Sequence, residues 1–345
     1  MSRGTLGNLR ETTKATMRDI FKGGKIFRLE PGKLRSPHFF KNSLSYRHRV
    51  MRKFRAAHKS PKRFRCPLCR SSNGTPYLSY RWYHVIECQR CRLVSPSIDF
   101  SKLGGPEVYD DPDYIADTER EILATYEYRK KTYAPERLAY ILEKTKLTPR
   151  HLRVLDVGCG PGYFLSHLKD RRIASKGLEV AEFLVALCRQ RGLPVDNTDL
   201  RRERPRSWNV ITLFDVLEHL AEPLPFFKLL RRTLTPGGFV VAYTPHIHSV
   251  AYLLMGGEQN TLLPMQHLCF FDPTSLRYLA QKSGFTVESI EYFGLDLIDY
   301  LAMKEHHDGY PYIKKLRDGI PYLQAAIDKA GVSNHLRVVL RSTKR

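Results

Sequence analysis

The feature that most constrains this chain is a glycine-rich turn that follows a short apolar stretch ending in an acid. Residues 154–164 read VLDVGCGPGYF. This pattern predicts a strand, a turn and a helix, because Gly158, Gly160 and Gly162 can adopt backbone conformations that a side chain would forbid. The helix would direct its free N–H groups at a bound ligand. The turn therefore predicts a ligand-binding loop, and residues further along the chain must specify the ligand.

Residues 151–245 alternate strand and helix patterns, which is typical of an α/β sheet built from βαβ units. The predicted second strand ends at Glu179, 19 residues after Gly160. An acid at this position can accept hydrogen bonds from both hydroxyls of a ribose. Among the polar residues after the third strand, we expect Asp199 to accept from an adenine amino group. Residues 208–215 (WNVITLFD) are apolar, as a central parallel strand should be.

Two C-x-x-C pairs precede this region. Cys66 and Cys69 form the first pair, and Cys88 and Cys91 follow after an 18-residue spacer. This spacing predicts a four-cysteine zinc site with a closed tetrahedral shell, so the Zn2+ would be structural. The residues between the pairs predict a hairpin that covers the metal. A redox role is disfavoured, because no βαβ pattern surrounds either pair.

The motifs that follow the cysteines resemble those of the class I S-adenosylmethionine-dependent methyltransferases. They read LDVGCGPGYF, GLEV, WNVITLFDVLEHL, LTPGGFVVAYTP and QHLCFFDPTSLRYLAQKSGF, and they span residues 153–285. The resemblance implies an α/β fold with a Rossmann-like seven-stranded sheet whose last strand is antiparallel. It also implies S-adenosylmethionine as the methyl donor. A zinc ribbon ahead of such a domain is similar to bacterial methyltransferases of sugar, polysaccharide and secondary-metabolite pathways.

The resemblance also implies roles for matching residues. The three glycines would line the amino-acid part of the cofactor, with Asp156 ordering the loop or binding the ammonium. Glu179 would hold the ribose and Asp199 the adenine edge. Phe214 and Asp215 would flank the methionine arm, although core packing is an equal alternative for Phe214.

Methyl transfer to a hydroxyl or an amine benefits from a base, and four histidines are candidates. They are His219, His246, His248 and His267. His267 stands where the resembling sugar C-methyltransferases place their active-site histidine. This chain has Pro264 and Gln266 where those enzymes carry tyrosine and glutamate, which leaves His267 as a base for an O- or N-acceptor. A hydrogen-bonded structural histidine is the equal alternative for it. His219 follows Glu218 at a helix start, and a framework role is the alternative for it.

The remaining segments complete the predicted organisation. Residues 114–146 predict a helix interrupted near Pro135. Tyr109, Tyr114 and Tyr133 are candidate lid or acceptor-pocket residues, and core or surface packing is the favoured alternative for each. Residues 246–266 interrupt the strand–helix alternation and could fold over the pocket. Asp272 is suited to cap a helix that Gly284 ends. We predict four regions: a partly disordered basic extension (1–62), a zinc ribbon (63–98), a linker with helices (99–150) and the methyltransferase domain (151–345) with a helical insertion at about 294–334.

Charge is concentrated at the N-terminus. Residues 1–65 hold 19 of the 57 Lys and Arg but only 3 of the 35 Asp and Glu. A loosely docked tail, an anionic membrane surface, RNA and a transit segment are the interpretations that this composition leaves open. A short amphipathic helix is predicted near residues 6–21.

We expect a cytoplasmic enzyme, or one peripheral at a membrane surface, because the chain has no long apolar run and its cysteine pairs suit a reducing compartment. The expected partner is a small-molecule or glycan acceptor, and the oligomeric state is open. RNA methylation is the main alternative function, although FDVL replaces an Asn-Pro-Pro-Tyr signature after the fourth strand. A non-catalytic scaffold and a nicotinamide-dependent oxidoreductase are weaker alternatives.

Overall fold

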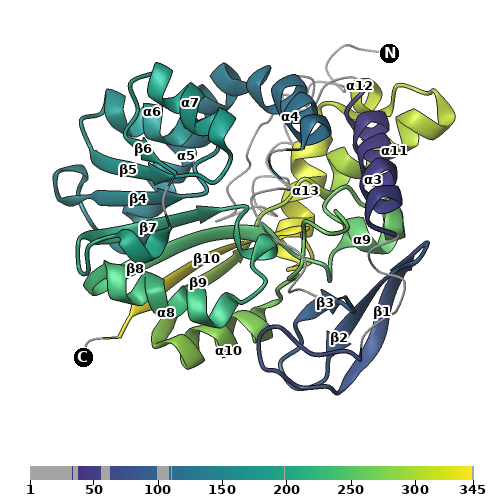
Figure 1. The fold of residues 1–345 in the computed structure, drawn as a ribbon. Helices are drawn as coiled ribbons and strands as arrows, with labels where there is room; N and C mark the ends of the chain where they lie inside the picture. Colours follow the sequence, from purple (N-terminus) through teal and green to yellow (C-terminus); the bar gives the residue numbers. More distant parts are fainter. Residues whose placement is uncertain are drawn as a thin grey trace, which may run out of the picture.

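The protein is built around one seven-stranded sheet (Figure 1). The computed structural model describes residues 38–55, 63–98, 111–197 and 199–343, together with Lys33 and Tyr109. Within this sheet the strands lie in the order β6-β5-β4-β7-β8-β10-β9. Their bounds are β4 (Arg153–Val157), β5 (Ala174–Leu178), β6 (Val195–Asp196), β7 (Trp208–Phe214), β8 (Leu234–Pro245), β9 (Phe285–Tyr292) and β10 (His335–Ser342).

The directions and order of the strands indicate where a ligand would bind. Strands β4 to β8 pair in parallel, whereas β10 runs antiparallel to both of its neighbours. This arrangement confirms the predicted sheet and its antiparallel last strand. The chain order reverses at β4, which has β5 on one side and β7 on the other. Ligands of such sheets bind at the carboxyl ends of the strands beside this reversal.

Helices cover both faces of the sheet (Figure 1). One layer consists of α5 (Tyr126–Thr145), α6 (Tyr163–Asp170) and α7 (Glu182–Gln190), and the other of α8 (Pro223–Thr233) and α10 (Pro273–Ser283). Alternate residues of β7 supply the two cores: Val210 packs under α5 and α6, and Ile211 packs with α8 and α10. Asp272 caps α10 through a capping box, and Gly284 ends that helix in the left-handed conformation, as predicted.

The helix break expected near Pro135 lies elsewhere. Helix α4 (Pro112–Thr118) passes into a π-helical turn (Glu119–Leu123), and α5 then runs through Pro135 without interruption. A proline inside a helix removes one hydrogen bond and costs about 3 kcal/mol. Burial of Ala134, Leu138 and Ile141 against the sheet offsets that cost in α5.

Residues 39–55, expected to belong to a loosely docked tail, form a packed helix, α3 (Phe39–Arg55). Phe40, Arg47 and Met51 are buried. The Arg47 guanidinium donates to the carbonyl oxygens of Gly257 (2.8 Å), Glu258 (2.9 Å) and Gln259 (3.0 Å). This helix therefore belongs to the folded body. The amphipathic helix predicted near residues 6–21 lies outside the described residues.

The cysteine-rich segment forms a small three-stranded sheet of its own. It contains β1 (Gly74–Tyr80), β2 (Tyr83–Cys88) and β3 (Val94–Pro96), and β1 and β2 form the predicted hairpin. The backbone of Val94 exchanges hydrogen bonds with that of Phe270, which ties the ribbon to the large sheet domain. The ribbon is therefore joined to the segment that contains His267.

The remaining helices pack around α11 (Asp296–Asp308), which also contacts α3. They are α9 (Val250–Met255), α12 (Tyr312–Leu316) and α13 (Ile320–Lys329), with 3₁₀ turns at Pro149–His151, Leu200–Arg202, Leu217–His219 and Gly256–Glu258. Helices α11 to α13 lie between β9 and β10 in sequence, where inserted helices were predicted. In the part of the chain that the structure describes, no helix has the length and apolarity needed to cross a bilayer.

Candidate active site and cysteine cluster

The glycine turn links β4 to α6 at the sheet's reversal point. Gly158, Gly160 and Gly162 all have positive φ, at 69°, 55° and 79°. A Cβ on Gly158 would meet the Cγ2 atom of Val216 at 2.6 Å, whereas a Cβ on Gly160 would meet no described atom within 4 Å. The backbone at Gly160 therefore faces open space. This arrangement fits a cofactor that must approach the main chain closely.

A matched pair of glycine substitutions tests this interpretation. Gly160→Ala should cost about 1 kcal/mol of stability through its positive φ, and its methyl group would project into the ligand space and weaken cofactor binding. Gly158→Ala should cost more stability, because its methyl group also collides with Val216. Denaturant unfolding and calorimetry with S-adenosylhomocysteine measure the two effects. Equal losses of stability in the two variants would contradict the conclusion that the backbone at Gly160 faces open space.

Glu179 closes the same turn. Its Oε2 accepts from the Gly160 N–H (2.8 Å), and its Oε1 accepts from the N–H groups of Val180 (2.8 Å) and Ala181 (3.0 Å). Burial raises the pKa of Glu179, and these three N–H groups oppose that shift. The carboxylate is thus held in place beside the turn, where its remaining lone pairs can accept from hydroxyl groups.

Asp156 lies deeper, under the turn rather than at its surface. Its Oδ1 accepts from the Thr212 hydroxyl at 2.6 Å, and the side chain is buried. Burial raises the pKa of Asp156 to about 7, against the opposing effects of Thr212 and Arg137. Asp156 therefore joins the ends of β4 and β7.

The Asp156 carboxyl predicts a pH dependence of stability. The folded chain holds this proton up to about pH 7, whereas an unfolded chain releases it near pH 3.8. Unfolding therefore releases protons between these values, and this contribution to stability falls as pH rises. Asp156→Asn still offers Thr212 an acceptor but cannot titrate, so the variant should gain stability relative to the wild type across that window. Unfolding free energies at several pH values provide the measurement, and a constant difference would contradict the shifted pKa.

Asp199 stands at the end of the loop that follows β6. Its side chain caps the 3₁₀ turn Leu200–Arg202 by accepting from the Arg201 N–H at 2.8 Å, and it is 48% exposed. The neighbouring Asp196 pairs instead with Lys176 at 2.8 Å. Asp199 therefore remains accessible beside the carboxyl end of the sheet, as the adenine role requires.

The side chains of Phe214 and Asp215 lie in different environments. The Phe214 ring packs edge-on against Phe164 and Tyr243, and the Arg137 guanidinium lies 4.0 Å from its centroid. Asp215 has a φ of 59°, an uncommon conformation for a residue other than glycine, and its side chain is 51% exposed. Phe214 is therefore packed in the core, which was the alternative to its cofactor role. The half-exposed Asp215 carboxylate lies 3.9 Å from the Arg137 guanidinium.

Two of the four candidate histidines lie together. The rings of His219 and His267 have centroids 4.7 Å apart and are nearly perpendicular. His219 Nδ1 lies 3.1 Å from the Gln266 carbonyl oxygen, and His267 Nδ1 lies 2.7 Å from that of Thr261. Burial lowers the pKa of His219 to about 4 and that of His267 well below its usual value, so both rings are neutral.

The other two histidines lie apart from this pair. His246 Nδ1 faces the Ser333 carbonyl oxygen at 2.9 Å, and burial lowers the pKa of His246 to about 4. His248 stacks edge-on against Tyr77 of the ribbon. Neither contact brings these rings to the carboxyl ends of β4 and β5.

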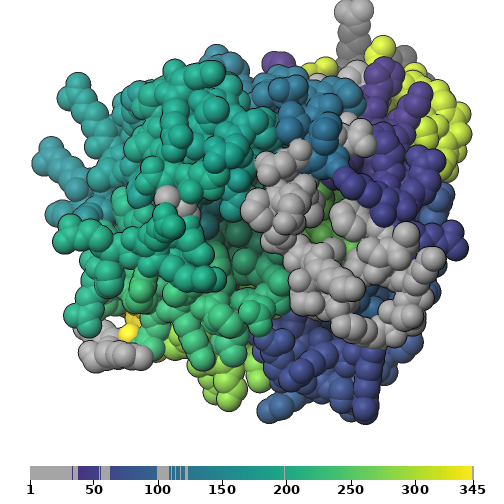
Figure 2. Space-filling model, viewed as in Figure 1, coloured from purple at the N-terminus to yellow at the C-terminus, as the bar shows by residue number. Residues whose placement is uncertain are grey.

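Tyr109 covers the region between the turn and the histidine pair. Its ring centroid lies 6.3 Å from that of His219 and 5.3 Å from that of Tyr114, which in turn contacts Phe183. Burial raises the pKa of Tyr109, and Glu179 and Glu218 add to the shift. Tyr109 and Tyr114 thus pack with other rings beside the candidate site, and their lid role remains a prediction, whereas Tyr133 packs beside Arg129 and Arg137. The face of the molecule is hollowed near the centre of Figure 2, to the left of α3 and the ribbon.

The four cysteines of the ribbon form a compact cluster. Their sulfurs all lie within 4.8 Å of one another, with Cys66 and Cys91 at 3.5 Å and Cys69 and Cys88 at 3.4 Å. The two C-x-x-C turns are equivalent: in each, the residue after the second cysteine has positive φ and donates its N–H to the first cysteine's carbonyl oxygen. These distances are close to the sulfur separation of about 3.8 Å that Zn–S bonds of about 2.3 Å impose on a tetrahedron. The cluster could therefore hold Zn2+.

Sequence analysis missed the residues that hold the His267 segment. The Tyr83 hydroxyl of the ribbon donates to the His267 carbonyl oxygen at 3.3 Å, and the Gln266 side chain donates to the Tyr46 hydroxyl of α3. Arg47 fixes residues 257–259, just before Thr261. The pattern of basic residues in α3 does not predict these contacts, because each contact joins residues far apart in sequence. The ribbon and α3 therefore both contact the segment that contains His267.

Comparison with known proteins agrees with this geometry. Residues 126–290 match the family described as a methyltransferase domain. A ubiquinone biosynthesis O-methyltransferase from Chromobacterium violaceum is 26% identical over 175 residues, which cover 46% of this chain and 75% of that protein. A protein of the same description from Pseudomonas fluorescens is 29% identical over 171 residues, 45% of this chain and 73% of that protein.

These matches identify residues 126–290 as a methyltransferase domain, and they confirm the predicted enzyme class and its methyl donor, S-adenosylmethionine. Among solved structures, a SAM-dependent methyltransferase from Archaeoglobus fulgidus aligns with 66% of this chain and 99% of its own length, at 20% identity and a TM-score of 0.46. The resemblance to sugar and secondary-metabolite enzymes remains a prediction.

Proposed function

We propose that this enzyme transfers the methyl group of S-adenosylmethionine to a hydroxyl group of a small molecule. The observation that carries the proposal is the pair of neutral, fixed histidines, His219 and His267, beyond the end of β7. The relatives' description as O-methyltransferases of ubiquinone biosynthesis supports an oxygen acceptor. Sugars, glycans and secondary metabolites also carry such hydroxyls and remain within the proposed class.

The cofactor's residues follow from the turn. Gly158, Gly160 and Gly162 would line the methionine part of the cofactor, and Glu179 would accept from the ribose hydroxyls. Asp199 would bind the adenine edge, and Asp215 would face the methionine arm. When bound, S-adenosylmethionine supplies a methyl group already activated by the positive sulfur. The protein must therefore chiefly align an exposed acceptor oxygen with that group and exclude water.

We assign proton removal to the histidine pair. Each Nδ1 faces a carbonyl oxygen and must therefore carry the ring's proton, which leaves Nε2 of His219 and His267 with a free lone pair. Nε2 is an acceptor for the hydroxyl proton that is lost as the oxygen–methyl bond forms. Tyr109 would cover the acceptor and limit access of water.

The cysteine cluster supports a structural zinc ion bound by Cys66, Cys69, Cys88 and Cys91. Such a site has no open position for substrate, so its effect is to keep the ribbon against the His267 segment. Cysteine pairs with metal-ligand spacing suit a reducing compartment, so we propose a cytoplasmic location.

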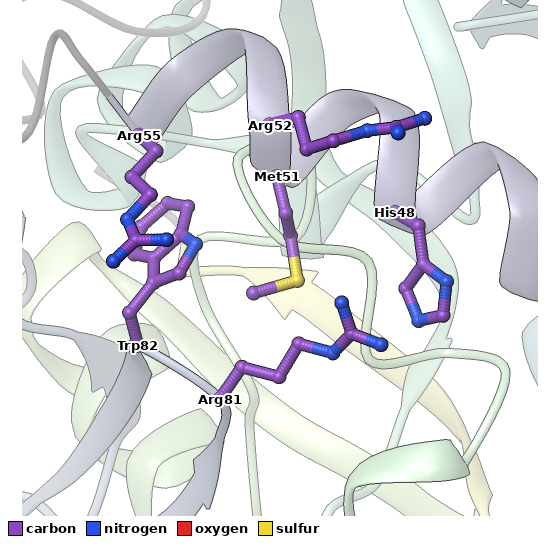
Figure 3. A pocket seen from close by; sticks show the side chains of 6 residues that line it. All are labelled: His48, Met51, Arg52, Arg55, Arg81 and Trp82. Carbon is purple, nitrogen blue, oxygen red and sulfur yellow. The ribbon is translucent and has the colours of Figure 1, made fainter.

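Methylation of RNA is the second candidate, and a basic pocket favours it (Figure 3). A cavity of about 220 Å³ between α3 and the ribbon hairpin is lined by His48, Met51, Arg52, Arg55, Arg81 and Trp82. Within the described part of the chain, none of its three arginines has an ion pair. Such a pocket suits phosphate groups, which is why RNA remains the alternative.

A cofactor-turnover assay separates the two functions. We expect S-adenosylhomocysteine to form with phenolic or sugar hydroxyl acceptors and not with RNA. Deleting residues 1–62 would remove α3 and its buried Arg47, so Arg52→Gln with Arg81→Gln is the cleaner test of the pocket, with exposed Arg150→Gln as the control. Turnover with RNA that falls steeply with salt and with the double substitution would favour the alternative. Turnover with neither class would contradict the proposed function.

A further inference from the structure

A buried carboxyl group, that of Glu218, lies beside the histidine pair. Glu218 is 1% exposed, and its Oε2 accepts from the Thr244 hydroxyl at 3.1 Å. Its Oε1 is buried and has no hydrogen-bond partner among the described residues. No lysine or arginine of the described chain forms an ion pair with it. A buried carboxylate without a positive partner is costly, so this oxygen requires an explanation.

The Glu218 carboxyl group lies beside the two histidines. One ligand atom each from Glu218, His219 and His267 can be chosen so that all three lie within 4.8 Å of one another. Because both Nδ1 atoms donate to carbonyl oxygens, both Nε2 lone pairs are available. A metal-binding histidine characteristically donates its other ring N–H to a carbonyl or carboxylate in this way. The cluster thus presents two neutral imidazoles and one carboxylate.

The backbone fixes these three groups relative to one another. The Glu218 carbonyl oxygen accepts from the N–H groups of Leu268 (2.6 Å) and Cys269 (3.0 Å). The Cys269 thiol contacts the Leu220 carbonyl oxygen at 3.2 Å. Hydrogen bonds therefore hold residues 218–220 against residues 268–269 without a bound ion. This gives the preorganisation that a metal site needs.

We propose that Glu218, His219 and His267 bind a divalent transition-metal cation, of the Mn2+, Fe2+, Co2+ or Zn2+ class, in a site distinct from the four cysteines. Two imidazoles and one carboxylate on one side of a cation leave positions open for other ligands. The inference rests on the proposed function and deepens it: the cation would bind the acceptor's hydroxyl oxygen and favour release of its proton to water. His219 and His267 would then act as metal ligands and not as the direct proton acceptors.

Mn2+ is the probe of choice, because a four-thiolate zinc site binds this harder cation poorly. Protein with zinc in the ribbon is titrated with Mn2+ and followed by electron paramagnetic resonance and calorimetry. We expect one Mn2+ per chain, and at least about 100-fold weaker binding in Glu218→Gln and His267→Gln, since each loses a direct ligand. Exposed His151→Gln is the control and should bind Mn2+ as the wild type does.

Two further measurements keep the result interpretable. Melting temperature and S-adenosylhomocysteine affinity near wild-type values show that the variants fold and that their cofactor site is intact. If the wild type binds no Mn2+ or Co2+ at millimolar concentration, or if Glu218→Gln binds as tightly as the wild type, the metal site is wrong. Turnover that survives removal of this cation would also overturn the metal inference while leaving the proposed methyl transfer standing.

Discussion

Glu179→Gln is expected to weaken S-adenosylhomocysteine binding by about 100-fold. The carboxylate accepts from three backbone N–H groups and would accept from the ribose as well. Hydrogen bonds to a charged group contribute about 1.5–3 kcal/mol each. An amide replaces one accepting oxygen with a donor, which would face the Gly160 N–H or the ribose hydroxyls. A loss of about 3 kcal/mol corresponds to roughly 100-fold in affinity.

The fold should tolerate this change. Burial raises the pKa of Glu179, so the folded chain already disfavours its charge and gains little stability from it. Calorimetry and thermal melting on the same sample separate binding from folding. Glu182→Gln is the matched control, because Glu182 is an exposed carboxylate three residues later that accepts from Asn197. Affinity within a few-fold of the wild type in Glu179→Gln would contradict the ribose role.

Cys66→Ser is expected to release the ribbon's zinc and to lower turnover about 100-fold while leaving cofactor affinity nearly unchanged. The cysteine cluster belongs to the hydrophobic core that also contains Phe271 and Leu276. Loss of the metal should therefore loosen both the ribbon and the segment bound to Val94 and Tyr83. Displacement of His267 by about 1 Å can cost two orders of magnitude in rate, whereas the glycine turn and Glu179 lie outside the ribbon's contacts.

Zinc content, melting temperature and single-turnover rate are the measurements for this substitution. Gln89→Ala provides the control, since Gln89 is an exposed residue between two predicted ligands and its hydrogen bonds to Asn73 and Thr75 lie within the ribbon. One zinc per chain in Cys66→Ser would rule out the four-cysteine site. Loss of zinc with unchanged turnover would instead show that the ribbon does not position His267.

The sequence alone determined the parts that depend on local pattern and spacing. The glycine turn, the acid that ends the second strand and the apolar fourth strand predicted the sheet and its cofactor. The spacing of the paired cysteines predicted the four-cysteine cluster. A C-x-x-C turn brings its two thiols together locally, so the cluster requires only that the two turns lie side by side. Prediction failed at Pro135, where propensity favoured a break and burial of the α5 face outweighed it.

Only the tertiary structure decided what surrounds the acceptor. Arg47 of the basic N-terminal segment binds carbonyl oxygens 210 or more residues away, and Tyr83 of the ribbon reaches the His267 backbone. Glu218 joins two histidines that are 48 residues apart in sequence. Such contacts leave no periodicity or spacing in the chain, because they depend on how complete elements pack. The sequence thus predicted where the methyl donor binds, and only the structure showed that α3, the ribbon and the His267 segment pack against one another.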